Sequence, residues 1–211
     1  TYKDGLSFTS KKASNYNSNG AVSESYQYSN DANAPPLITS YIYDSNGNII
    51  SETISTQGIT NQTTTYQYDT TKRFVTKTTT PDGLSSSSIV NPLGKISEET
   101  SSLGLKTYYS YDNWGNVTEI TDYLGKKTTI SKSVSSGITN GIYNLSKKRE
   151  GGVETIITFD DFDREIQSKA QSINSKWLVA KTEYDIFGRK SKYSEPFFEG
   201  DAIKWSEIKY D

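Results

Sequence analysis

The chain has 211 residues, with 25 acidic and 23 basic side chains, a formal net charge of −2, and neither His nor Cys. The lack of His and Cys excludes disulfides, thiolate nucleophiles, Ser-His-Asp relays and His- or Cys-based metal sites. The balanced charge argues against nucleic-acid binding, and no apolar run approaches the roughly 18 residues of a membrane-spanning helix, so membrane insertion is not expected.

Hydropathy and aromatic content point in opposite directions. Hydrophobic residues make up only 32% of the chain and the mean hydropathy is −0.70, values that taken alone are typical of disorder. The chain nevertheless contains 16 Tyr, 7 Phe and 3 Trp, and only 5 Pro. Tyr, Thr, Ile and Val suit a pleated, half-buried surface. The composition therefore predicts an all-β fold whose core uses Tyr where most folds use Leu.

One short pattern recurs: an aromatic or β-branched residue, any residue, an aromatic residue, then Asp. It occurs at residues 41–44, 66–69, 109–112, 157–160, 182–185 and 208–211, with degenerate copies at 26–29 and 89–91. From Asp44 onward the copies are 21 to 26 residues apart, except for a double interval of 48 residues between Asp112 and Asp160, where a drifted copy is expected near 131–134. The motif residues are Tyr41, Tyr43, Asp44, Tyr66, Tyr68, Asp69, Tyr109, Tyr111, Asp112, Phe159, Asp160, Tyr184, Asp185, Tyr210 and Asp211.

The residues on the C-terminal side of each Asp are equally regular. Three residues after the Asp or Asn come Gly47, Gly94, Gly115 and Gly188, and Asp163 occupies the same offset after Asp160. Asp is favoured at the first position of a type I turn, and Gly at the fourth because the chain there often needs a positive φ. The spacing therefore predicts tight turns, with a looser one after Asp69, where Lys72 replaces the Gly.

The segments around these turns are predicted strands. In residues 64–68 aromatic and polar residues alternate, and a second strand is expected to start at about residues 48, 95, 116 and 189. A second Gly-bearing turn closes most periods, and no helical periodicity is present. Residues 1–211 are thus predicted to form about eight tandem β-hairpin repeats in one long antiparallel meander. The partial repeats at both ends indicate a piece of a larger protein.

The set Tyr-x-Tyr-Asp-x-x-Gly-(Asn/Arg)-(Ile/Val) resembles the YD or Rhs repeat family. That resemblance implies a segment of a β-sheet that spirals into a hollow shell, as in bacterial Rhs polymorphic toxins, insecticidal toxin-complex subunits and the animal teneurins. It implies a structural wall around a C-terminal toxin domain outside this chain, and secretion or display on a bacterial surface. The implied partners are neighbouring repeats, the enclosed toxin and export or surface machinery. No catalytic residue, cofactor or metal is expected.

The main alternative is a cell-surface binding module. Trp114, Trp177 and Trp205 could stack on glycans or partner proteins, because aromatic rings supply rigid contact area. The competing interpretation places Trp114 in a hairpin turn, covering a neighbouring strand, and packs the other two in the sheet.

A third hypothesis is an enzyme. The acids Asp160, Asp161 and Asp163 cluster, and a carboxylate pair can hydrolyse glycosides. However, the turn pattern already accounts for Asp160 and Asp163, so no catalytic role is assigned to them.

Overall fold

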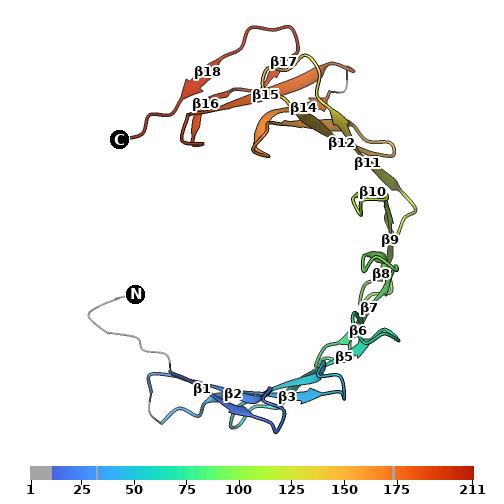
Figure 1. The fold of residues 1–211 in the computed structure, drawn as a ribbon, viewed down its shortest axis with the longest axis vertical. Coiled ribbons are helices and arrows are strands. Elements are labelled where there is room, and N and C mark those ends of the chain that lie inside the picture. Colours follow the sequence, from blue (N-terminus) through green and yellow to red (C-terminus); the bar gives the residue numbers. More distant parts are fainter. Residues whose placement is uncertain (1–10, 32, 173) are drawn as a thin grey trace. The chain divides into compact units, whose positions relative to one another are not determined.

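The computed structural model describes residues 11–31, 33–172 and 174–211 (Figure 1). All regular secondary structure in these ranges is β, and they contain no helix. The strands are β1 (Lys11–Tyr16), β2 (Val22–Tyr28), β3 (Leu37–Tyr43), β4 (Ile49–Ser55), β5 (Gln62–Tyr68), β6 (Val75–Thr79), β7 (Ser85–Val90), β8 (Ile96–Thr100), β9 (Lys106–Tyr111), β10 (Val117–Thr121), β11 (Lys127–Val134), β12 (Tyr143–Arg149), β13 (Glu154–Phe159), β14 (Glu165–Gln171), β15 (Trp177–Tyr184), β16 (Lys190–Ser194), β17 (Phe197–Phe198) and β18 (Trp205–Glu207). The predicted all-β class is confirmed.

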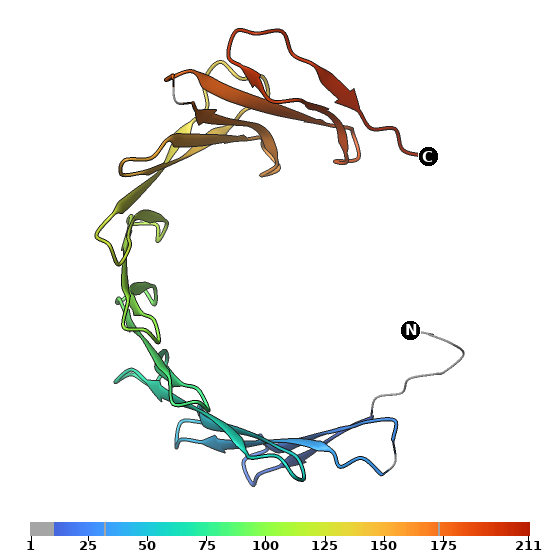
Figure 2. The same ribbon diagram turned by 180° about the vertical axis from the view of Figure 1, so that it is seen from behind.

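The chain divides into two compact units, Thr1–Lys106 and Thr107–Asp211. In the first unit each strand from β1 to β8 pairs antiparallel with the next. The second unit repeats this order from β9 to β16 (Figure 2). Near its end the edge of β15 is shared by β16 and the short β17, and β18 pairs with β16. Each unit is therefore a hairpin meander, as the sequence predicts.

Five of the repeat motifs end in a register shift at their last aromatic residue. The ladder shifts between Ile42 and Tyr43, and again between Gln67 and Tyr68 and between Glu183 and Tyr184. Such a bulge leaves one extra residue on one strand and increases the local twist. The extra residue lies on the second strand, as Ile50 does opposite Ile42 and Tyr43, and the two rings of the motif share one face because they are two residues apart.

Burial in the sheet is shallow. Tyr41 and Tyr43 are half-buried on one face, whereas Ile42 between them is 59% exposed on the other. Val179 is the only buried hydrophobic side chain among the described residues. The accessible surface of 15016 Å² exceeds the roughly 9,800 Å² expected for a compact protein of this mass. The expectation of a Tyr core is therefore wrong in degree: the rings form half-buried rows and no enclosed core.

The covered part of the sheet lies in the second unit, where the predicted drifted copy falls. β11 ends at Val134, and the loop of residues 135–142 replaces the short Asp-to-Gly turn of the other repeats. The loop is closed by the Ser135 amide, which donates to the Ile142 carbonyl at 3.0 Å. A Cβ at Gly141 would lie 2.7 Å from Ser135 Oγ and 2.9 Å from Thr158 Cγ2, so this position needs Gly. The loop thus packs closely against β13.

Candidate functional site

The repeated Asp organises each turn with its own carboxylate. Asp44 Oδ1 accepts hydrogen bonds from the amides of Asn46 and Asn48, both at 2.9 Å. The backbone closes the turn through the Gly47 amide, which donates to the Asp44 carbonyl at 3.1 Å, and Gly47 has φ 84°. The same pair of side-chain bonds recurs at Asn91, Asp112, Asp122, Asp160 and Asp185.

The two residues that replace Gly at the fourth turn position adopt the same backbone conformation as the glycines. Asp163 and Lys72 both have φ 58°, in the left-handed region that favours Gly. The turn at Lys72 is one residue longer, because the Asp69 amide bonds the Phe74 carbonyl at 2.9 Å. It is nevertheless densely bonded, since the Asp69 carboxylate accepts from the amides of Thr71, Arg73 and Phe74 and from the Thr71 hydroxyl. The predicted looser turn is therefore a wider one.

The second aromatic residue of the motif links neighbouring repeats. Tyr68 donates its hydroxyl to the backbone carbonyl of Ile49 at 3.0 Å, and Ile49 is the fifth residue after Asp44 of the preceding repeat. We call this bond the tyrosine clasp. The other clasps are Tyr43 to Val22 at 2.6 Å, Tyr184 to Glu165 at 3.0 Å and Tyr210 to Lys190 at 2.8 Å. Each hydroxyl thus joins its segment of the chain to the start of the second strand of the previous hairpin.

The residue after the turn glycine position makes a second link. Arg164 pairs with Asp160 of its own turn at 2.7 Å, and its guanidinium lies 4.5 Å from the centre of the Tyr184 ring in the next repeat. In the same way Arg189 pairs with Asp185 and lies 4.2 Å from the centre of the Tyr210 ring. The sequence marks this position only as Asn or Arg after Gly, and its bridging role was missed because the partner lies a full repeat away.

These hydrogen bonds lower the pKa of the turn carboxyl groups. The backbone amide of Asn48 is the main cause at Asp44, and the Asn116 side chain is the main cause at Asp112. At Asp160 burial alone would raise the pKa, but the bonds from Arg164 and from the amides of Arg164 and Phe162 outweigh it and lower the pKa. A carboxylate that accepts several N–H bonds holds its proton less readily.

The acidic cluster is divided among structural contacts. Asp160 is buried and committed to its turn and to Arg164, while Asp163 Oδ1 accepts from the Tyr143 hydroxyl at 2.6 Å. Asp161 is exposed on the turn. In the ranges that the structure describes, no group of three or more Asp and Glu residues is arranged to hold a metal ion. The geometry therefore gives Asp160 a role in its turn and Asp163 a hydrogen bond from Tyr143.

The three Trp side chains have different surroundings. Trp114 stands in its turn with 90% of its surface exposed, so the interpretation that it covers a neighbouring strand is wrong. Trp177 is half-buried beneath the ammonium of Lys169, 4.8 Å from the ring centre. Trp205 is half-buried and has the Lys192 ammonium 4.6 Å from its ring centre.

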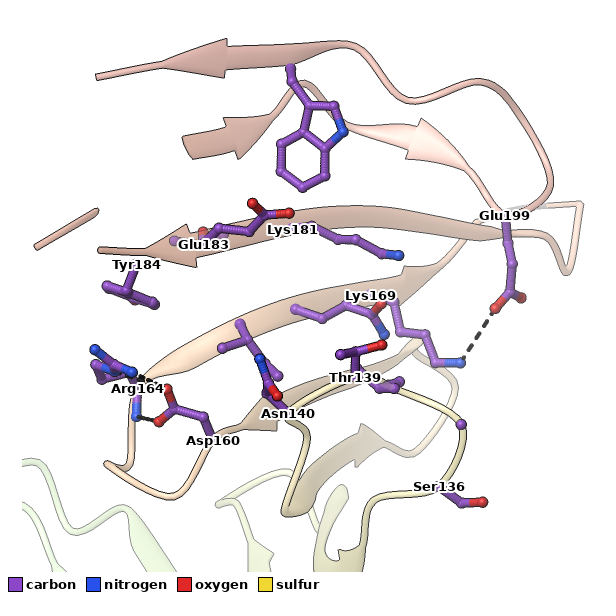
Figure 3. A pocket seen from close by; sticks show the side chains of 16 residues that line it. Ser136, Thr139, Asn140, Asp160, Arg164, Lys169, Lys181, Glu183, Tyr184 and Glu199 are labelled. Carbon is purple, nitrogen blue, oxygen red and sulfur yellow. Dashed lines mark hydrogen bonds and ion pairs between the residues drawn. The ribbon is translucent and has the colours of Figure 1, made fainter. Parts of the chain in front are cut away.

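A cavity of about 670 Å³ opens in the second unit, beside the 135–142 loop. Its wall includes residues 136–140 of that loop, parts of β14 and β15, and Trp205 of β18. An ion pair lies toward each end of the view in Figure 3: Arg164 with Asp160 at 2.7 Å, and Lys169 with Glu199 at 3.7 Å. Lys181 and Glu183 lie on β15 between them. Periodicity did not predict this cavity, because its loop interrupts the repeat.

Known proteins resemble the chain in its repeats and in its fold. The RHS Repeat family matches residues 91–128, and no curated protein matches the chain. The chain is similar to the Photorhabdus luminescens Tc holotoxin pore, with 11% identity over 95% of this chain and a TM-score of 0.51. It is also similar to the TcdB2-TccC3 crystal structure, with 11% identity over 93% of the chain and a TM-score of 0.46. The chain spans 13% and 15% of the length of those two chains, and identity at this level concerns the fold.

Proposed function

We propose that the chain is a tandem array of YD or Rhs repeats and that it forms part of the wall of a hollow β-shell in a secreted bacterial protein. We further propose that the shell encloses a toxin or effector domain lying outside these 211 residues. The partners of the chain would then be its neighbouring repeats and that domain, with export or surface machinery handling the whole.

The tyrosine clasp is the observation that carries this proposal. The clasps at Tyr43, Tyr68, Tyr184 and Tyr210 recur in equivalent positions in both units. A hairpin alone cannot hide its apolar face, and each clasp adds the next hairpin in a fixed register. A sheet built in this way extends by nearest-neighbour contacts without requiring a second layer. That property suits a thin wall, and the large exposed surface agrees with it.

Similarity to the Tc holotoxin pore supports the same proposal at the level of the fold. The Asp and Tyr residues of the repeat motif have structural roles, since the turn carboxylates bind backbone amides and the clasp hydroxyls bind backbone carbonyls. We therefore assign no catalysis to the chain.

The test is electron cryo-microscopy of the full-length secreted protein. We expect a closed or spiral shell with a hollow interior, and density for these residues in its wall. A solid body without an interior space, or repeats projecting as a separate rod, would overturn the proposal. The second interpretation, a surface binding module, is favoured by one specific observation, the cavity beside the 135–142 loop.

A further inference from the structure

The cavity of the second unit contains polar groups that the fold does not use. We propose that it binds a neutral saccharide, through Gln167, Lys181 and Glu183 and with Trp205 at its wall. This goes beyond the role of the chain as shell wall, because it places a ligand site on one face of that wall.

The Gln167 amide is the most buried of these groups. Its residue is only 8% exposed and lines the cavity, and its side-chain amide, which makes no hydrogen bond to the described residues, still reaches solvent. A ligand hydroxyl in the cavity would satisfy this amide, which both donates and accepts.

Lys181 and Glu183 add a free cation and a free anion. They are two residues apart on β15 and so point to the same face of the sheet (Figure 3). Within the described part of the chain, neither side chain has an ion-pair or hydrogen-bond partner. The other four charged residues of the wall are already joined as Arg164 with Asp160 and Lys169 with Glu199. The Lys181 ammonium can therefore donate hydrogen bonds to a ligand, and the Glu183 carboxylate can accept them.

The balance of charge indicates the class of ligand. Three cations and three anions line the cavity, so it offers no net attraction to a phosphate or a polybasic segment. An amide, an ammonium and a carboxylate together suit adjacent sugar hydroxyls, each of which donates one hydrogen bond and accepts others. The indole of Trp205 supplies a flat apolar surface for the C–H face of a sugar ring.

The loop that frames the cavity is held in place before any ligand binds. Gly141 packs too closely against Ser135 and Thr158 to admit a Cβ, and the Ile142 amide bonds the Phe159 carbonyl at 2.8 Å. Pre-organisation of this kind lowers the ordering cost of binding.

The test uses the full chain with Trp114→Phe, which removes the fluorescence of the exposed Trp114 in its turn. A glycan array of neutral and acidic oligosaccharides identifies the saccharide class, and a titration of the best neutral hit is followed by tryptophan fluorescence. We expect binding that Lys181→Met and Glu183→Gln each weaken roughly tenfold, the effect of one lost ligand hydrogen bond. Lys148→Met, on β12 outside the cavity, is the control and is expected to leave affinity unchanged.

Lys181→Met and Glu183→Gln keep the test decisive, because these side chains make no ion pair or hydrogen bond within the described chain and their variants are expected to fold. Gln167→Leu is a third variant that removes the side-chain amide of Gln167. An array without neutral hits overturns the proposal. Binding that survives both β15 variants overturns it too, as does a response to free amino-acid zwitterions in place of sugars. The shell proposal is unaffected by any of these results, since microscopy of the full-length protein tests it separately.

Discussion

The two units use the same turns and the same tyrosine clasp, yet they differ in burial. The described residues of the first unit include no buried side chain, whereas the second unit contains Thr158, Asp160, Gln167, Val179 and Ser194, all buried. In the second unit the 135–142 loop packs against Thr158, and β17 pairs with Leu178 and Val179. The repeat unit alone is thus sufficient to form a sheet, and burial appears where the repeat is interrupted.

This difference separates two sources of stability. The first unit depends on its backbone ladder, turn carboxylates and clasps, each of which contributes locally. The second unit has these contributions and, in addition, a small packed region around Thr158 and Val179. A mutation at a motif position next to buried residues should therefore destabilise the second unit more than the equivalent mutation destabilises the first. A mutation that removes only a tyrosine clasp should destabilise both units equally.

The largest difference is expected for the motif Asp itself. Asp160→Ala removes two accepted amide bonds and leaves Arg164, only 28% exposed, without its partner. We expect a loss of about 3 kcal/mol in the free energy of unfolding of the second unit. Urea denaturation followed by tryptophan fluorescence measures it, because all three Trp lie in that unit.

Two matched variants sharpen this comparison. Asp44→Ala removes the equivalent turn bonds where nothing is buried, and should affect hydrogen exchange in β3 and β4 less than Asp160→Ala affects β13 and β14. Asp161→Ala changes the exposed neighbour and should have no effect. Equal losses for Asp44→Ala and Asp160→Ala would show that burial adds nothing to the shared turn.

The sequence predicted the features that depend on neighbouring residues and missed those that depend on residues far apart in the chain. The Asp-to-Gly spacing placed the turns and the strand starts correctly, because a turn is decided by backbone bonds within five residues, such as those around Asp44. The reach of Arg164 to Tyr184 and the cavity beside the 135–142 loop depend on residues a repeat or more apart. The exposed position of Trp114 was also missed, since its type indicated packing while its turn allowed none.

The clasp is expected to contribute equally in both units. Tyr68→Phe in the first unit and Tyr184→Phe in the second each remove one hydroxyl-to-carbonyl bond between repeats and keep the ring. We expect each to cost about 1 kcal/mol. Hydrogen exchange at the amides of the clasped strand pairs measures the change.

Tyr123→Phe is the control for the clasp, because Tyr123 is exposed in a turn and its hydroxyl bonds nothing in the described chain. A loss confined to Tyr184→Phe would mean that the clasp matters only beside the packed region. It would then no longer account for the cohesion of the first unit.

The smallest expected difference is the response to acid, which both units should share. The pKa of Asp44 and Asp69 in the first unit and of Asp160 and Asp185 in the second lies below the ordinary value of 3.8. A carboxyl whose pKa is lowered by folding stabilises the fold above its unfolded pKa, and this contribution is lost as the pH falls through 3.8 toward the folded value. Because the chain has no His, we expect no His-linked change in stability between pH 7 and pH 5, and a loss of stability below about pH 4.

Asp112→Asn separates charge from geometry in this acid response. Asn91 already forms the same turn with a neutral side chain, whose Oδ1 accepts from the amides of Leu93 and Lys95, both at 3.0 Å. The variant should therefore keep its turn and make the acid loss slightly shallower. NMR titration of the Asp carboxyl carbons provides the direct measurement in both units. Values at or above 3.8 for Asp44 and Asp185 would contradict the account, because the turn amides would then not favour the charged carboxylate.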